Sequence, residues 1–168
     1  MLIYITCDIF MAFIEFAFDE NGKQPVLDHL MQLRQQAATG DSDAVWLLAR
    51  IARALNFIQR HGIPGSIGQT LIANDDSGFP LTLVDPVKEL VYHQPLLELR
   101  VNKPRRTGAY RAIFFPFEHI GNQILVFTHS VIKQSTASPD FEAIVQETKA
   151  MLPDFNQNPS KYIHLLKG

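Results

Sequence analysis

Apolar and polar positions form two patterns along this chain, one typical of β-strands and one typical of α-helices. Runs of Ile, Leu, Val, Phe and Tyr that are bounded by turn residues are typical of buried β-strands. Such runs occupy residues 2–6, 11–18, 96–101, 110–117 and 124–131. A weaker strand at residues 83–91 is interrupted by Pro86, which cannot donate a backbone hydrogen bond. The Gly-Asn pair at residues 121–122 predicts the turn between the last two strands.

Two helices are expected between the first strands and the central ones. Pro25 opens a helical pattern of apolar positions that ends at Gly40. Asp41 or Ser42 caps a second helix, which closes at Gly62. Because the connection between these helices is short, they are expected to form an antiparallel helical hairpin.

The chain after the second helix is less regular. Residues 62–82 contain four Gly, two Pro and two Asp, which predicts a long loop, with a short strand around Thr70–Ala73 as an alternative. A last helix is expected to begin at Ser138 and to stop at Pro153, with residues 154–168 as a tail.

The order of elements predicts an α+β fold. Its sheet of four to five strands is mainly antiparallel, with the helical hairpin on one face and the C-terminal helix also packed against it. Since both faces of residues 110–117 and 124–131 are apolar, the face opposite the hairpin needs a cover from the last helix or from a partner protein. The length of 168 residues predicts a single domain.

Composition narrows the class of protein further. The net charge is −2 and apolar residues make up 46%, as in folded globular chains. A single cysteine, Cys7, favours a reducing compartment, so a cytoplasmic location is expected. Asp8 and Glu15 interrupt the first apolar run and no cation precedes it, which argues against a signal peptide or a membrane anchor.

Positive charge is concentrated beside one pair of strands. Five cations lie within twelve residues, and no acid lies between them: Arg100, Lys103, Arg105, Arg106 and Arg111. Such a cluster in an acidic chain predicts a local anion site, and the backbone of a nucleic acid is the most plausible anion. The histidines show no metal-ligand spacing, so neither a metal nor a cofactor is expected.

Several segments in this order resemble the RelE/HigB-like toxins of type II toxin–antitoxin systems, in particular the phage-derived HigB-like branch. The resemblance covers residues 11–152, which leaves residues 1–10 as an N-terminal extension and 153–168 as a C-terminal tail. Its motifs are Phe13-Ile-Glu-Phe, Asn21-Gly-Lys-Gln-Pro-Val-Leu-Asp-His-Leu, Leu97-Glu-Leu-Arg, Tyr110-Arg-Ala-Ile-Phe-Phe, and Val126-Phe-Thr-His-Ser-Val-Ile-Lys-Gln with Pro139.

This resemblance implies a RelE-like fold and a small cytoplasmic toxin that is inhibited by a cognate antitoxin protein. It also implies a metal-independent endoribonuclease that cleaves mRNA at the ribosome. In that reaction the ribose 2′-OH attacks its own phosphate, which leaves a cyclic phosphate and a free 5′-OH. The alternative is a catalytically weak binding module of the same fold that acts on a protein, either an antitoxin or a gyrase-like target.

The resemblance also assigns candidate catalytic residues. Arg111 matches the family's strand arginine and suits stabilisation of the transition state, because a guanidinium stays protonated and fits a phosphate. Arg100, on the next strand, shares a face with Glu98 by alternation and binds phosphate or supports Arg111. Lys133 matches the first of two basic positions, whereas Gln134 stands where the second is expected.

Proton transfer and RNA binding have further candidates. The ordinary pKa of histidine suits proton transfer near neutrality, which makes His129 a candidate. The alternative is a core residue, because strand alternation groups His129 with Leu125 and Phe127. Tyr110 either packs in the core or stacks on a base. Lys103, Arg105 and Arg106, with Gln134, are candidates for binding the RNA backbone, and a solvated turn is the alternative for the three cations. The nuclease interpretation requires Arg100 and Arg111 to converge on a shared phosphodiester pocket. It fails if the two arginines point apart, or if a carboxylate locks each of them with no open groove between them.

Overall fold

The structure is a computed structural model in which residues 11–75, 77–102 and 108–164 are described. Its main sheet has five strands in the order β1-β7-β6-β5-β4. β1 runs parallel to β7, and the other neighbours are antiparallel. The strands are β1 (Phe13–Phe16), β4 (Val87–Glu89), β5 (Leu97–Val101), β6 (Ala109–His119) and β7 (Asn122–Lys133).

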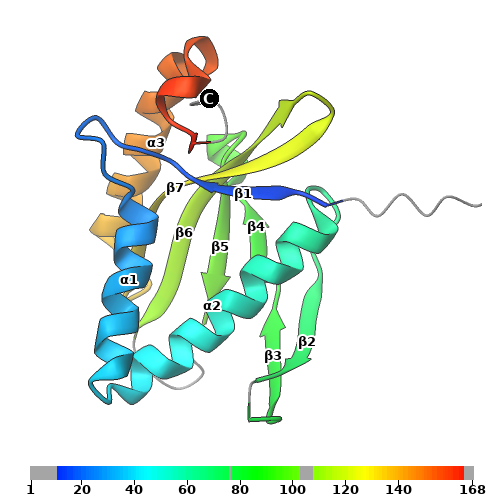
Figure 1. The fold of residues 1–168 in the computed structure, drawn as a ribbon, viewed down its shortest axis with the longest axis vertical. Coiled ribbons are helices and arrows are strands. Elements are labelled where there is room, and N and C mark those ends of the chain that lie inside the picture. The colour runs from blue at the N-terminus through cyan, green and yellow to red at the C-terminus, as the bar shows by residue number, and fades with distance from the viewer. Residues whose placement is uncertain (1–10, 76, 103–107, 165–168) are drawn as a thin grey trace, which may run out of the picture.

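Helices cover both faces of this sheet. α1 (Pro25–Ala38) and α2 (Ser42–His61) cross the face nearest the viewer in Figure 1, and α3 (Pro139–Gln157) packs on β6 and β7 from the other face. The side chain of Asp41 caps α2 by accepting the N–H groups of Asp43 and Ala44 at 2.9 and 3.1 Å. The helical hairpin predicted from the sequence is confirmed.

Each face of the sheet has its own hydrophobic core, because side chains alternate along the strands. Under α1 and α2, Phe114 of β6 stacks on Phe127 of β7 with ring centres 4.6 Å apart. Under α3, Phe115 meets Phe155 edge to face at 4.9 Å. The last helix therefore supplies the cover that the second apolar face requires.

The loop expected at residues 62–82 contains a strand pair. β2 (Thr70–Asn74) and β3 (Pro80–Val84) form an antiparallel two-stranded sheet, and their inward residues pack toward α2. The strand predicted at 83–91 is divided between β3 and β4, because Asp85 adopts a positive φ of 49° and Pro86 follows it. The alternative of a strand at Thr70–Ala73 is confirmed.

Two predicted boundaries are wrong: the end of the last helix and the position of the turn between β6 and β7. α3 continues through Pro153 to Gln157, where Phe155 is fully buried and the following Tyr162 and Ile163 pack into the same core. The turn between β6 and β7 is made by Ile120 and Gly121, whose φ values are 50° and 74°, as in the mirror-image turns of two-residue hairpins. The strand predicted at residues 2–6 lies outside the described residues.

The architecture is α+β, with three α-helices and a mostly antiparallel five-stranded sheet in the described part of the chain. None of the helices in that part is long and apolar enough to cross a membrane.

Candidate functional site

Arg100 and Arg111 are directly opposite each other in the β5–β6 ladder. Directly opposed residues project from the same face, so the two arginines share the α3 face of the sheet. The neighbouring Leu99 and Val101 are buried in the core under α1 and α2, which agrees with the alternation expected for β5. The fold therefore places the two arginines side by side.

A carboxylate holds Arg100. Its Nε donates to the carbonyl oxygen of Asp85 at 2.7 Å, and its Nη2 donates to Oδ2 of the same residue at 2.8 Å. Arg100 thus binds both the backbone and the side chain of Asp85, the residue between β3 and β4. The pair is partly solvated, since the side chains are 20% and 35% exposed.

Arg111 also has a carboxylate partner, and this ion pair is more buried than that of Arg100. Its Nε lies 3.5 Å from Oε2 of Glu98, and its other nitrogens donate to the side chain of Asn102 at 2.6 Å and to the carbonyl of Tyr110 at 2.9 Å. Burial lowers the pKa of Arg111, the charge of Glu98 raises it, and the positive charge of Arg100 lowers it. The guanidinium is oriented by these partners.

The two arginines thus lie together, but each already has an anionic partner. A phosphate can take the place of Asp85 or Glu98, or bind at the edge of the pairs, only in competition with those carboxylates. The two hollows described below are lined by other residues. The first half of the condition that would overturn the nuclease prediction, a carboxylate on each arginine, is therefore met.

Lys133 extends the same face toward the end of β7. It is opposite Ala109, two residues before Arg111, so it shares the face of the arginines. Its Nζ lies 5.2 Å from the ring centre of Phe141, at the start of α3. The side chain of Gln134 lies beside Gly108. Lys103, Arg105 and Arg106 lie outside the described residues, in the segment that joins β5 to β6 at this end.

Tyr110 points to the opposite face. It is 1% exposed, its ring centre lies 5.7 Å from that of His29 of α1, and burial raises its pKa. A side chain in this position cannot stack on a base at the arginine face. Of the two readings of Tyr110, the structure supports the core residue.

An irregularity in the ladder changes the face of His129. The β6–β7 register shifts between Ile113 and Phe114, so that Thr128 and His129 both lie opposite Ile113. Both side chains then face α3, where the hydroxyl of Thr148 lies 2.6 Å from that of Thr128 and 3.2 Å from Nδ1 of His129. The expectation that His129 shares a face with Leu125 and Phe127 is wrong.

The bulge brings His129 onto the same face as the candidate arginines. Its Nε2 lies 3.1 Å from Oε2 of Glu147, so both ring nitrogens have partners. Burial lowers the pKa of His129, while the charges of Glu147 and Asp19 raise it. The neutral ring is therefore the stable form near neutrality, with its nitrogens turned toward α3.

His129 also lines a hollow of about 470 Å³ between α3 and the loop that follows β1. At its far side Lys161 and Tyr162 donate to Asp154, and these hydrogen bonds lower the pKa of Asp154 to about 2. In the part of the chain that the structure describes, no group of three or more His, Cys, Asp or Glu side chains could hold a metal ion.

Asp85 and Asn102 are site residues that sequence reasoning missed. Asp85 is fifteen positions from Arg100, and no local pattern pairs the two. The only available signal is that an Asp-Pro pair marks a corner near the central strands.

Comparison of the chain with protein-family models, with curated proteins and with solved structures gave no match.

Proposed function

We propose that this protein is a RelE/HigB-like toxin with a RelE-like fold that acts on mRNA as a metal-independent endoribonuclease. The observation that carries the proposal is the gathering of Arg100, Arg111 and Lys133 on one face of three adjacent strands. These positions are the arginines and the lysine of the motifs on β5, β6 and β7 that resemble the toxin family. A phosphodiester backbone is the ligand that such a face suits best.

The local charge balance supports an anionic ligand. Asp85 and Glu98 pair with Arg100 and Arg111, and Lys133 on the same face has no carboxylate partner among the described residues. Positive charge from these three residues is therefore in excess by Lys133 alone, and the sequence adds Lys103, Arg105 and Arg106 in the segment outside the described residues. An excess of this kind attracts RNA even though the whole chain is slightly acidic.

Each candidate residue has a distinct part in this proposal. Arg111, oriented by Glu98 and Asn102, is positioned to donate to a phosphate oxygen as negative charge develops in the transition state. Lys133 adds charge beside it. His129, on the same face, has to exchange its bond to Glu147 or Thr148 for the substrate before it can transfer a proton.

The test is cleavage of an end-labelled mRNA in a cell-free translation reaction. The wild-type protein should give fragments with a cyclic phosphate and a 5′-OH. Arg111→Ala should lower the cleavage rate by about 10²–10³-fold, as expected when a donor to the transition state is removed. Lys133→Gln should also lower it. Arg34→Ala, which removes an exposed arginine from α1, is the matched control and should cleave at the wild-type rate.

Equal rates for the wild type and Lys133→Gln would count against the site, because Lys133 is neither buried nor ion-paired among the described residues and its loss removes only the contact with the ring of Phe141. Equal rates for the wild type and a folded Arg111→Ala would overturn the catalytic claim.

A second candidate is a RelE-fold binding module that acts on a protein and cleaves nothing. It is favoured by one specific observation, that each guanidinium is already bound to a carboxylate. The presence of Gln134 at an expected basic position points the same way. Salt-insensitive association with a protein, without binding to single-stranded RNA, would identify this second function.

A further inference from the structure

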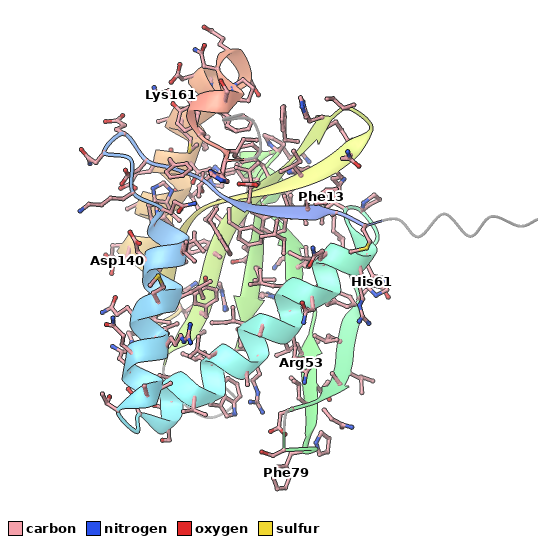
Figure 2. All side chains as sticks on the ribbon, in the orientation of Figure 1. Phe13, Arg53, His61, Phe79, Asp140 and Lys161 are labelled. Atoms are coloured by element: carbon pink, nitrogen blue, oxygen red, sulfur yellow. The ribbon has the colours of Figure 1, made fainter. Side chains whose placement is uncertain are left out.

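A groove separates α2 from the outer edge of the β2–β3 hairpin. Its volume is about 440 Å³. One wall is formed by α2 and the other by β2, and the lining residues are Arg53, Asn56, Phe57, Arg60, His61 and Thr70–Ala73. Figure 2 shows Arg53 and His61 on the part of α2 that lies beside the hairpin, with Phe79 at the hairpin tip. Four consecutive residues of β2 line the groove, so it follows the backbone edge of this strand.

The hydrogen bonds at both ends of the hairpin fix which backbone groups face this edge. Asp85 donates to the carbonyl of Gln69, and Asp75 donates to the carbonyl of Phe79. Since hydrogen-bonded pairs alternate in an antiparallel ladder, Leu71 and Ala73 also bond to β3. The N–H and C=O groups of the alternate residues, Thr70 and Ile72, therefore point away from β3. Outside the β2–β3 ladder, no backbone hydrogen bond among the described residues uses them, and no third strand pairs with this hairpin there.

The two sides of this edge differ in chemistry. On the side toward α2 the groove is lined by Arg53, Arg60 and His61, and none of its lining residues is acidic. On the outer side the hairpin presents apolar groups to solvent, since Ile72 is 77% exposed and Val84 is 67% exposed. A strand added at this edge would place alternate side chains against the cations and against the apolar surface.

We propose that the β2 edge binds an extended acidic segment of a protein partner as a third strand of the hairpin. Main-chain hydrogen bonds to Thr70 and Ile72 would supply affinity, as in other cases of strand addition to an exposed edge. Acidic side chains at every second position would lie against Arg60 and His61, and apolar side chains between them would cover Ile72. This surface is independent of the arginine face.

The charge of the groove favours such a partner over a second copy of this chain. β2 itself reads Thr-Leu-Ile-Ala-Asn and has no acid to offer the cations of a neighbouring molecule. Two such edges brought together would also bring two sets of α2 arginines close to each other. The groove therefore fits a segment of opposite charge better than it fits its own counterpart.

The probe is a fluorescein-labelled peptide of about ten residues with alternating Glu and Val, long enough to span the five residues of β2. Its binding to the full chain is measured by fluorescence anisotropy. The same peptide with Lys in place of Glu should bind at least about tenfold more weakly, because charge complementarity selects the occupant. Arg60→Gln should weaken binding of the Glu peptide.

A matched pair of variants tests the backbone contact. Ile72→Pro removes the outward N–H without removing a hydrogen bond to β3, a position at which edge strands tolerate proline. Ile72→Ala removes the same side chain but keeps the N–H. The proline variant should bind the Glu peptide at least about tenfold more weakly than the alanine variant.

Hydrogen exchange provides a readout on the wild-type protein. The amides of Thr70 and Ile72 should exchange rapidly in the free protein and slowly with the Glu peptide bound, whereas those of Leu71 and Ala73 are slow in both states. The proposal is overturned if the Glu peptide does not bind, if the Lys peptide binds equally well, or if binding leaves Thr70 and Ile72 unprotected. A wild-type dimer that already protects these two amides would assign the edge to a second copy instead.

Discussion

The strength of the Arg111–Glu98 pair decides how readily Arg111 can receive a phosphate. The two side chains are 11% and 10% exposed, and Nε lies 3.5 Å from Oε2. Coulomb's law with an effective dielectric constant of about 20 gives an attraction of about 5 kcal/mol at this separation. The measurable coupling should be smaller, about 2 kcal/mol, because desolvation opposes the pair and Arg100 repels Arg111.

A double-mutant cycle measures this coupling. Glu98→Gln leaves the Arg111 guanidinium without its carboxylate and should lower the free energy of unfolding by about 3 kcal/mol. Arg111→Met removes the cation but keeps an unbranched side chain. The double variant Glu98→Gln/Arg111→Met should recover about 2 kcal/mol relative to the sum of the two single losses.

The assay is urea unfolding of the four proteins, followed by circular dichroism near neutral pH and analysed by linear extrapolation. The pair of Arg100 with Asp85 is a built-in comparison, because its greater exposure predicts a coupling below about 1 kcal/mol. A coupling between Glu98 and Arg111 of less than about 0.5 kcal/mol would refute the reasoning. Glu98 would then bind Arg111 too weakly to compete with a phosphate.

Three further predictions concern the core and the bulge. Phe127→Ala should destabilise the protein by about 3–5 kcal/mol in urea unfolding, because the ring is fully buried against Phe114. Thr148→Val should cost about 1–3 kcal/mol in the same assay, since it removes the 2.6 Å hydrogen bond of the buried Thr128 hydroxyl and leaves it only the 3.4 Å bond to the carbonyl of Ile113. Because the folded state lowers the pKa of His129, the unfolded chain binds more protons below about pH 6.5 and stability should fall as the solution is acidified. His129→Asn should reduce that fall, which is measured from urea midpoints at mildly alkaline and mildly acidic pH.

The secondary structure was largely predictable because local rules determine it. Pro25 at the start of α1 and Asp41 as the cap of α2 lie where capping chemistry puts them. The alternation of faces along β5, with Leu97, Leu99 and Val101 in the core under α1 and α2, follows from its sequence. The end of α3 could not be predicted, since Pro153 ends a helix by local rules while burial of Phe155 sustains it here.

The site was less predictable because it depends on contacts between distant segments. The placement of Arg100 opposite Arg111 follows from the register of one hairpin, which strand patterns indicate. The partner of Arg100 comes from the corner at Asp85, whose position no local pattern gives. The orientation of His129 depends on a single extra residue in the ladder, which reverses the face that alternation assigns.

The central claim is that the cationic end of the sheet binds the phosphates of RNA. The most direct measurement is the salt dependence of binding to a single-stranded RNA, compared between the wild type, Lys133→Gln and the α1 control Arg34→Gln. If Lys133 contacts one phosphate, its loss should reduce the slope of log affinity against log salt concentration by about 0.7, while Arg34→Gln keeps the wild-type slope. Identical slopes for all three proteins would contradict the account.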